Sequence, residues 1–386
     1  MSSVSLAPDK RPLLLLSANS AWNVANFRMG LLRALVGEGY AVVVAAPADV
    51  HESGLADEHV RFVPLAIDRS GMNPVTDLQL LGRYRQLMRS FRPAAFLSFT
   101  IKPNIYGSLA ARVAGVPAIN NISGLGTMFL GKGWQAHLAH GLYRAAMRRS
   151  PTVFFQNPDD RQLFVEAGTV RSEQAKLLPG SGIDLTRFTP APLPAERPPT
   201  FLFIGRLLAD KGVREFVEAA RLVMQEFPEA RFEMLGGMDP GNRTAINPDE
   251  ILRWRQEANV QMLGEAADVR PHIARATAVV LPSYREGLPR VLLEAAAMAR
   301  PLIATDVPGC RSIVDHERNG FLCAVRDARA LADAMIRLIR LPGEKREAMG
   351  RAARARVEAE FSEQTVIQAY LGALRDIGAN SRVGQA

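Results

Sequence analysis

Residues 278–300 of this chain read AVVLPSYREGLPRVLLEAAAMAR. An apolar run over 278–281 ends at Pro282, a short polar turn follows, and the rest is apolar-rich with helical character. The pattern predicts a buried strand, a turn and a helix, with Glu286 where the helix begins and Glu294 about two turns further in. In an open α/β sheet, ligands bind beyond the carboxyl ends of the strands, where helix N-termini point their N–H groups. A ligand that carries both a diphosphate and sugar hydroxyls would suit this combination.

Strand-like and helix-like segments alternate along the whole chain, which predicts parallel, doubly wound sheets. A stretch rich in proline and glycine over 179–200 indicates a linker. We therefore expect an α/β protein with two tandem Rossmann-like domains, at 1–185 and 186–361, followed by a C-terminal segment at 362–386. We expect a polar loop over 20–27. The expected strands span 13–18, 40–46, 60–64, 94–98, 117–122, 153–156, 175–178, 201–205, 231–236, 260–263, 278–281, 302–304 and 320–323.

The bulk composition limits the class of protein. The chain has 386 residues, 48% of them hydrophobic and 22% charged, which is typical of a globular protein with two domains. A net charge of +8 indicates an anionic partner and does not choose among a phosphorylated substrate, a membrane surface and a nucleic acid. With two cysteines, Cys310 and Cys323, no disulfide framework can form, so we expect a reducing cytoplasm. Long uninterrupted apolar windows are missing, so we expect any membrane contact to be peripheral.

A second motif, GRLLADKG at 205–212, stands between an expected strand and an expected helix. Gly205 lets the backbone turn, and Arg206 and Lys211 place two cations near a helix N-terminus, where the helix dipole and the cations both favour a diphosphate. A solvated basic turn is the alternative. The two glutamates alone are also ordinary surface charges, but the combination with the cations is more specific, because one segment supplies cations for phosphates and the other carboxylates for hydroxyls.

The second half of the chain resembles the retaining glycosyltransferases of family 4, which have the GT-B fold of two Rossmann-like domains with a cleft between them. The resemblance implies that the last helix, over 362–377, crosses back onto the first domain. The family needs no metal, and no D-x-D motif indicates one; no cofactor is implied. The matching pieces are residues 205–212, 282–289 (PSYREGLP), the E-x₇-E pair Glu286 and Glu294, 305–309 (TDVPG) and 182–188.

The resemblance also implies roles for the residues of the second domain. Arg206 and Lys211 would hold the donor diphosphate and stabilise the charge that develops on it. Glu294 would bind the ribose hydroxyls, and Glu286 would act near the transferred sugar. The resemblance thus makes Arg206, Lys211 and Glu286 the candidate catalytic residues. The implied donor site consists of Gly205, Arg206, Lys211, Glu286, Gly287, Leu288, Pro289 and Glu294.

The first half resembles bacterial enzymes that extend polyprenyl-diphosphate-linked sugars, on the runs 98–107 (SFTIKPNIYG) and 120–126 (NNISGLG). Many relatives have a histidine at the place of Ser123, and a hydroxyl cannot titrate near neutral pH as histidine does. Lys102 is a candidate for the acceptor phosphate, with a solvated lysine as the alternative. The asparagines near the first strand offer amide donors or cap a turn. The candidate acceptor site consists of Asn19, Asn23, Lys102, Asn104, Ser123 and Gly124.

A basic amphipathic run covers 132–149. One interpretation is an ordinary helix that packs within the domain. The other is a membrane-surface element, whose arginines meet anionic headgroups while Trp134 and Leu138 enter the interface. The adjoining run 126–133 (GTMFLGKG) is not a nucleotide-binding P-loop, because Gly133 replaces the required Ser or Thr. The candidate membrane contacts are Lys132, Trp134, Arg144, Arg148 and Arg149.

Together these patterns favour a retaining glycosyltransferase that moves a sugar, such as an N-acetylhexosamine, from a UDP-sugar to a polyprenyl-diphosphate-linked saccharide. Such an enzyme would work in the cytoplasm, on the inner face of the cell membrane. Two alternatives stay open at this point: another GT-B enzyme such as a UDP-sugar 2-epimerase, and a non-enzymatic basic protein that binds nucleic acid. No nucleic-acid motif supports the second. The sequence leaves the donor sugar, the acceptor and the oligomeric state open.

Overall fold

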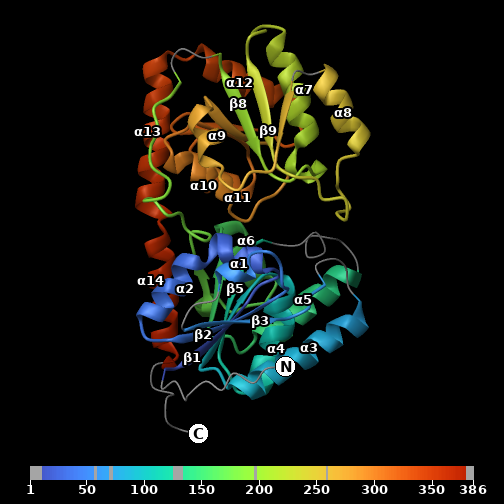
Figure 1. The fold of residues 1–386 in the computed structure, drawn as a ribbon, viewed down its shortest axis with the longest axis vertical. Helices are drawn as coiled ribbons and strands as arrows, with labels where there is room; N and C mark the ends of the chain where they lie inside the picture. Colours follow the sequence, from blue (N-terminus) through green and yellow to red (C-terminus); the bar gives the residue numbers. More distant parts are fainter. Residues whose placement is uncertain are drawn as a thin grey trace. The chain divides into compact units, whose positions relative to one another are not determined.

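The computed structural model describes residues 11–55, 59–68, 73–124, 134–194, 198–257 and 260–379. The chain divides into two compact units (Figure 1). The first comprises residues 1–181 together with 363–386, and the second comprises 182–362. Each unit has a parallel sheet with helices packed on it, so the predicted class of two Rossmann-like α/β domains is confirmed.

The sheet of the first unit has seven described strands in the order β3-β2-β1-β4-β5-β6-β7, all paired in parallel. Its strands are apolar along most of their length and its central ones are buried, as expected for a parallel sheet covered on both faces. The strands are β1 (Leu13–Ser17), β2 (Ala41–Ala46), β3 (Val60–Pro64), β4 (Ala95–Phe99), β5 (Ala118–Ile122), β6 (Thr152–Phe155) and β7 (Ala175–Leu177).

One expectation for this unit is wrong. Residues 20–27 do not form a polar loop, because α1 (Ala21–Phe27) begins there. The side chain of Ser20 accepts a hydrogen bond from the Asn23 N–H at 3.1 Å and so caps the helix. The other helices are α2 (Met29–Gly37), α3 (Pro74–Phe91), a π-helical turn (Pro103–Gly107) that continues into α4 (Ser108–Val113), α5 (Trp134–Met147), α6 (Pro158–Glu166) and α14 (Glu363–Asp376).

The last helix, α14, belongs to the first unit although the whole second unit precedes it in the chain. It packs against α2 and buries an apolar face that includes Ile367 and Leu374 (Figure 1). The hydroxyl of buried Tyr370 accepts a hydrogen bond from the Asn121 side chain at 2.9 Å, at the end of β5. The return of the chain end to the first domain is therefore as expected.

The second unit has a sheet with six described strands in the order β10-β9-β8-β11-β12-β13, again all parallel. The strands are β8 (Thr200–Ile204), β9 (Arg231–Leu235), β10 (Val260–Gly264), β11 (Ala278–Leu281), β12 (Leu302–Thr305) and β13 (Gly320–Cys323). The helices are α7 (Val213–Met224), α8 (Pro248–Glu257), α9 (Arg270–Arg275), α10 (Arg290–Ala297), α11 (Pro308–Arg311), α12 (Ala328–Arg340) and α13 (Gly343–Glu360).

The described part of the proline-rich connection is fixed to the second unit by Arg300. The Arg300 side chain is fully buried, and its guanidinium donates to the carbonyls of Ala191 and Pro192, each at 2.8 Å. It also donates to Ile273 and Ala274 at the end of α9, at 2.9 and 2.6 Å. Burial lowers the pKa of Arg300 to about 10, so the group is still charged at pH 7. Main-chain carbonyls thus compensate the cost of burying this cation.

We expect Arg300→Met to destabilise the second unit by about 3 kcal/mol, because the buried carbonyls lose their donors and the connection loses its anchor. Urea unfolding followed by circular dichroism measures the loss. The matched control is Arg351→Met: Arg351 lies on α13 with its side chain 68% exposed, and its replacement should change stability by less than about 0.5 kcal/mol. Equal stability of the two variants would contradict this account of Arg300.

Candidate active site

The carboxyl ends of β8 and β11 lie side by side in the second sheet. The two strands pair in parallel, with Phe201 opposite Ala278 and Phe203 opposite Val280. From β8 the chain proceeds outward to β9 and β10, and it then returns to β11 on the other side of β8. The strand order therefore reverses between β8 and β11, and the segments that follow these strands meet at the point where open α/β sheets bind ligands.

The structure brings the two predicted motifs into contact at this point. The N–H of Tyr284 donates to the carbonyl of Asp210 at 2.8 Å. The Lys211 ammonium lies 2.5 Å from Oε1 of Glu286, an oxygen that also accepts from the Ser283 hydroxyl at 2.7 Å. The Lys211 and Glu286 side chains are 25% and 12% exposed, so this ion pair is partly buried yet open on one side.

Gly212 allows the close approach of the two segments. Its φ is +71°, in the left-handed region, and a Cβ added there would lie 2.0 Å from the carbonyl oxygen of Pro282. A side chain would thus be strained by the backbone conformation and would also collide with the neighbouring segment. Glycine is required here by the contact between the segments as well as by the turn.

The two glutamates of the E-x₇-E pair differ from expectation in one respect. Helix α10 begins at Arg290, so Glu286 lies in the preceding turn and not at the start of the helix. Glu294 lies within α10, where its carboxylate pairs with Arg290 one turn earlier at 2.9 Å. Burial raises the pKa of Glu294 above its ordinary value although the Arg290 charge opposes this. The two carboxylates therefore do not lie on one helix, and helical spacing does not set their relative position.

Arg206 and Lys211 pair with different carboxylates. Its guanidinium forms an ion pair with Asp239, beyond β9, at 2.6 Å, and its side chain is 59% exposed. Such exposed pairs contribute little to stability, so the guanidinium can exchange this partner for an anionic ligand at low cost. The loops after β8 and β9 are also in contact, because Gly236 lies where a Cβ would be 1.9 Å from the carbonyl oxygen of Gly205.

Helix α11 packs against the turn that carries Glu286. Gly309 at its start packs so closely that an added Cβ would lie 2.5 Å from the Gly287 carbonyl oxygen. The Thr305 hydroxyl donates to the Ser283 carbonyl. Sequence reasoning did not assign roles to Ser283 and Thr305, although both stand within the quoted motifs. Burial raises the pKa of the Cys310 thiol well above its ordinary value, which argues against a nucleophilic cysteine here.

In the first unit, Lys102 is held by a partner that sequence reasoning missed. The Lys102 ammonium lies 2.8 Å from Oδ1 of Asp77 on α3, and the Tyr106 hydroxyl donates to the other carboxylate oxygen at 2.9 Å. The Lys102 side chain is 14% exposed. Asp77 is 25 residues before Lys102 in the chain and carries no signal of its own. A phosphate at Lys102 would have to share the ammonium with this carboxylate.

Asn104 is buried in a polar network below the strand ends. Its side chain accepts from the Ser98 hydroxyl at 2.7 Å and donates to the Asn121 carbonyl at 2.8 Å. Asn120, also buried, donates to Ser98 at 2.7 Å. The structure thus gives Asn104 a supporting position at the ends of β4 and β5, one that does not expose it to a ligand.

The remaining acceptor candidates lie in the segments that follow β1 and β5, the carboxyl edge of the first sheet. Asn19 follows β1, and Ser123 and Gly124 directly follow β5. Asn23 lies in the first turn of α1, and its side-chain oxygen is buried without a hydrogen-bond partner among the described residues. Since β1 and β5 flank β4, these candidates share one edge of the sheet.

Helix α5 is amphipathic, as the basic run predicts. Tyr143 and Met147 are buried, whereas Arg144, Arg148 and Arg149 are exposed. Lys132, with the run 126–133, lies outside the described residues, and so does the side chain of Trp134. Across the described ranges, the structure contains no helix with the length and apolar character needed to cross a membrane.

Comparison with known proteins agrees with this architecture. Residues 24–181 match the model of the glycosyl transferase 4-like domain, and residues 198–340 match that of the group 1 glycosyl transferases. The chain is 24% identical to N,N'-diacetylbacillosaminyl-diphospho-undecaprenol alpha-1,3-N-acetylgalactosaminyltransferase of Campylobacter jejuni, over 90% of this chain and 94% of that protein. It is also 24% identical to UDP-Gal:alpha-D-GlcNAc-diphosphoundecaprenol alpha-1,3-galactosyltransferase of Escherichia coli, over 73% and 76% of the two chains.

Solved structures share the fold at low sequence identity. HepE of Anabaena, in complex with UDP and glucose, matches with a TM-score of 0.77 and 20% identity, over 95% of this chain and all of that one. Sucrose-phosphate synthase of Thermosynechococcus elongatus matches with a TM-score of 0.79 and 20% identity, over 96% and 100%. The two family models cover one domain each and together most of the chain. The chain belongs to the glycosyltransferases of the GT-B fold, with a family 4-like first domain and a group 1 second domain.

Proposed function

We propose that this enzyme is a retaining, metal-independent glycosyltransferase that moves an N-acetylhexosamine from a UDP-sugar to a polyprenyl-diphosphate-linked saccharide. The observation that carries the proposal is the contact between the segments after β8 and β11, where Lys211 and Glu286 meet. Support for the substrates comes from the relatives: two of them are named for diphosphoundecaprenol-linked acceptors, and HepE was solved with UDP and glucose. Assembly of a bacterial glycan, O-antigen or capsule would use this reaction.

The donor diphosphate would bind to the two cations of the segment after β8. Transfer breaks the bond between the anomeric carbon and the diphosphate, so negative charge grows on the leaving oxygen. Lys211 and Arg206 would stabilise that charge, which makes their contribution larger in the transition state than in the bound substrate. The Lys211 ammonium is preorganised for this task, because Glu286 and the turn around Gly212 already fix its position.

The two glutamates would bind hydroxyl groups. Glu294, largely buried in α10, would accept hydrogen bonds from the ribose, while Glu286 would contact the transferred sugar beside Lys211. The main-chain N–H groups around Gly287 and Leu288 would assist at the sugar or phosphate. Retention would follow if the acceptor hydroxyl attacks from the face that the diphosphate leaves.

The acceptor would bind at the carboxyl edge of the first sheet, near Asn19, Asn23 and Ser123. Because Ser123 cannot act as a base near neutral pH, the departing phosphate oxygen would take the proton of the attacking hydroxyl. Lys102, shared with Asp77, would contact the acceptor phosphate. Asn104 would act indirectly, because its hydrogen bonds hold the ends of β4 and β5 in place.

We expect Lys211→Ala to lower kcat by about 10² to 10³, because the variant loses a cation that acts on the developing charge. Glu294→Gln should instead raise the KM for the UDP-sugar about tenfold, since it weakens a charge-assisted hydrogen bond to the ribose. Steady-state kinetics with the purified protein separate the two effects. Exposed Lys345 on α13 supplies the control: Lys345→Ala should leave both constants unchanged. Near-normal turnover by a folded Lys211→Ala protein would refute the assignment.

We expect transfer only when both substrates are present. A panel of UDP- and GDP-sugars, tested with synthetic polyprenyl-diphosphate saccharides, should give an α-linked product with a UDP-N-acetylhexosamine, identified by the anomeric proton coupling in NMR spectra. Incubation with UDP-N-acetylglucosamine alone should return it unchanged. Conversion of the sugar without an acceptor would identify an epimerase instead, and failure with every polyprenyl-linked acceptor would refute the acceptor class.

We further propose that α5 brings the enzyme to the inner face of the cytoplasmic membrane, where such acceptors reside. Support comes from exposed Arg144 of α5, from exposed Arg148 and Arg149 directly after the helix, and from Leu138 of α5, which is 45% exposed. We expect flotation with vesicles that contain anionic lipid and not with neutral vesicles. Replacing Arg144, Arg148 and Arg149 by Glu should abolish the flotation. The same replacements at Arg329, Arg351 and Arg255 should not; unchanged flotation of the α5 variant would exclude this surface.

A further inference from the structure

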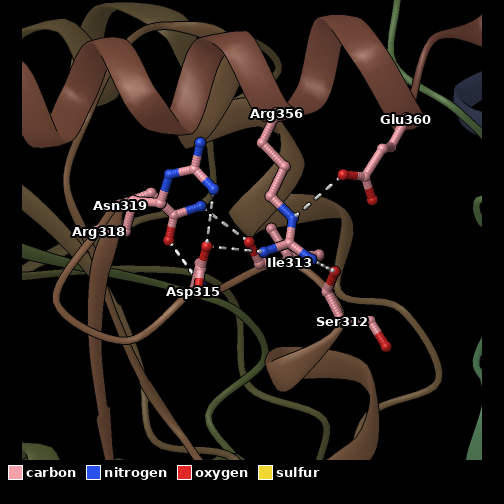
Figure 2. Close-up of polar contacts among 7 residues, drawn as sticks. All are labelled: Ser312, Ile313, Asp315, Arg318, Asn319, Arg356 and Glu360. Atoms are coloured by element: carbon pink, nitrogen blue, oxygen red, sulfur yellow. Dashed lines mark hydrogen bonds and ion pairs between the residues drawn. The ribbon is translucent and has the colours of Figure 1, made fainter.

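The segment between α11 and β13 is tied down by its own polar contacts (Figure 2). The Asp315 N–H donates to the side-chain oxygen of Asn319 at 2.7 Å. The Asn319 side-chain amide donates in turn to the Ile313 carbonyl at 3.0 Å, and Asn319 itself is 1% exposed. These hydrogen bonds join the two ends of residues 313–319, which form a compact loop that follows α11 in the chain.

Arg356 of α13 reaches this segment from outside (Figure 2). Its guanidinium donates to the carbonyl of Ser312 at 3.1 Å and lies 3.8 Å from the carboxylate of Asp315. Glu360, one turn later on α13, faces the guanidinium from the other side at 3.8 Å. Ser312 directly follows α11 as its C-cap, so Arg356 supplies a charged donor to a helix terminus whose carbonyls lack partners within the helix.

Arg354, two residues earlier on α13, makes an equivalent contact with α10. Its guanidinium donates to the carbonyl of Ala297, the last residue of that helix, at 2.7 Å, and to the carbonyl of Phe188 at 2.7 Å. One helix thus holds the C-terminal ends of both α10 and α11. These are the two helices that flank the turn of Glu286 and Gly287.

The position of α11 depends on such contacts because the helix is only four residues long. A single turn gains too few internal hydrogen bonds to be stable by itself. At one end Gly309 packs directly on the Gly287 carbonyl, where even a Cβ would not fit. At the other end Ser312 is held by Arg356. A shift of α11 away from α13 would therefore leave the Glu286 turn without its support.

We infer that Arg356 is a positioning residue of the donor site: through Ser312 and α11, it fixes the turn of Glu286 and Gly287 against the segment that carries Lys211. The inference rests on the proposed function for its consequence in donor binding. Arg354 does the same for α10 and its Glu294. Arg354 and Arg356 bind the C-terminal ends of α10 and α11 and would contact neither substrate.

The test compares Arg356→Ala with Arg351→Ala in the full-length protein. Both arginines lie on α13, but Arg351 is exposed and forms an ion pair with Glu347 of the same helix, at 3.5 Å. Hydrogen exchange of the ligand-free protein should become at least about tenfold faster at residues 283–289 and 308–315 in Arg356→Ala, with β8 and β9 unchanged. Calorimetry should show UDP binding weakened about tenfold. Arg351→Ala should behave as the natural protein in both measurements.

Two further variants keep the inference open to refutation. Arg356→Lys keeps the charge but not the planar fork, so it should restore UDP binding only in part. Asp315→Asn removes the negative charge beside the guanidinium and keeps the size of the side chain. It should also speed up hydrogen exchange and weaken UDP binding, by a smaller factor than Arg356→Ala. Uniformly faster exchange across the second unit, with UDP affinity unchanged, would show a general stabilising role and overturn the inference, as would natural behaviour of Arg356→Ala.

These readouts separate the inference from the proposed function. If the natural protein bound no UDP, the donor assignment would fail, while hydrogen exchange at 283–289 would still decide whether Arg356 supports the turn. If the natural protein bound UDP and Arg356→Ala bound it equally well with unchanged exchange, the proposed donor would stand and the positioning role would fall.

Discussion

The parallel pairing of β8 with β11 is the constraint on which the site depends. The two strands are separated by a long stretch of chain that includes β9 and β10, yet they lie next to each other in the sheet. Their pairing brings Lys211 and Glu286, 75 residues apart, to within 2.5 Å. The glycines at 212, 236 and 309 then let neighbouring backbones approach more closely than any side chain would permit. Sheet order determines which segments meet, and these glycines determine how closely.

Much of this arrangement could be predicted from the sequence, because the strands are apolar runs bounded by proline, glycine and polar turns. The motifs of the proposed donor site were also recognisable, since the cations of residues 205–212 and the E-x₇-E pair each stand within nine consecutive residues. Helix α1 was missed because Ser20, Asn23 and Asn26 suggest a loop, and the start of the helix depends on the Ser20 cap. Glu286 was assigned to the start of a helix because an apolar-rich pattern does not show that α10 begins only at Arg290.

The ionic partners could not be predicted, and the reason is physical. Asp77 meets Lys102, and Asp239 meets Arg206, only because different helices and loops of the fold end at the same edge of a sheet. Aspartates at helix starts and in loops are common in any sequence, so neither acid stands out. The same holds for Arg354 and Arg356 on α13, because the sequence of this helix contains several arginines and neither stands out. Their hydrogen bonds go to main-chain carbonyls, which no side-chain pattern reveals.

The second unit is inserted whole into the first, and its two ends are neighbours. Ile183, near its start, pairs with Ser362, its last residue, and the Ile183 N–H donates to the Phe361 carbonyl at 3.0 Å. Arg300 and Arg354 anchor the following connection to the same unit, so little free chain separates the junction from the folded body. A domain whose two ends are adjacent can be replaced as one piece without distorting the domain into which it is inserted. Recombination at residues 182 and 362 would therefore exchange the whole second unit, with the proposed donor site, on an unchanged first unit.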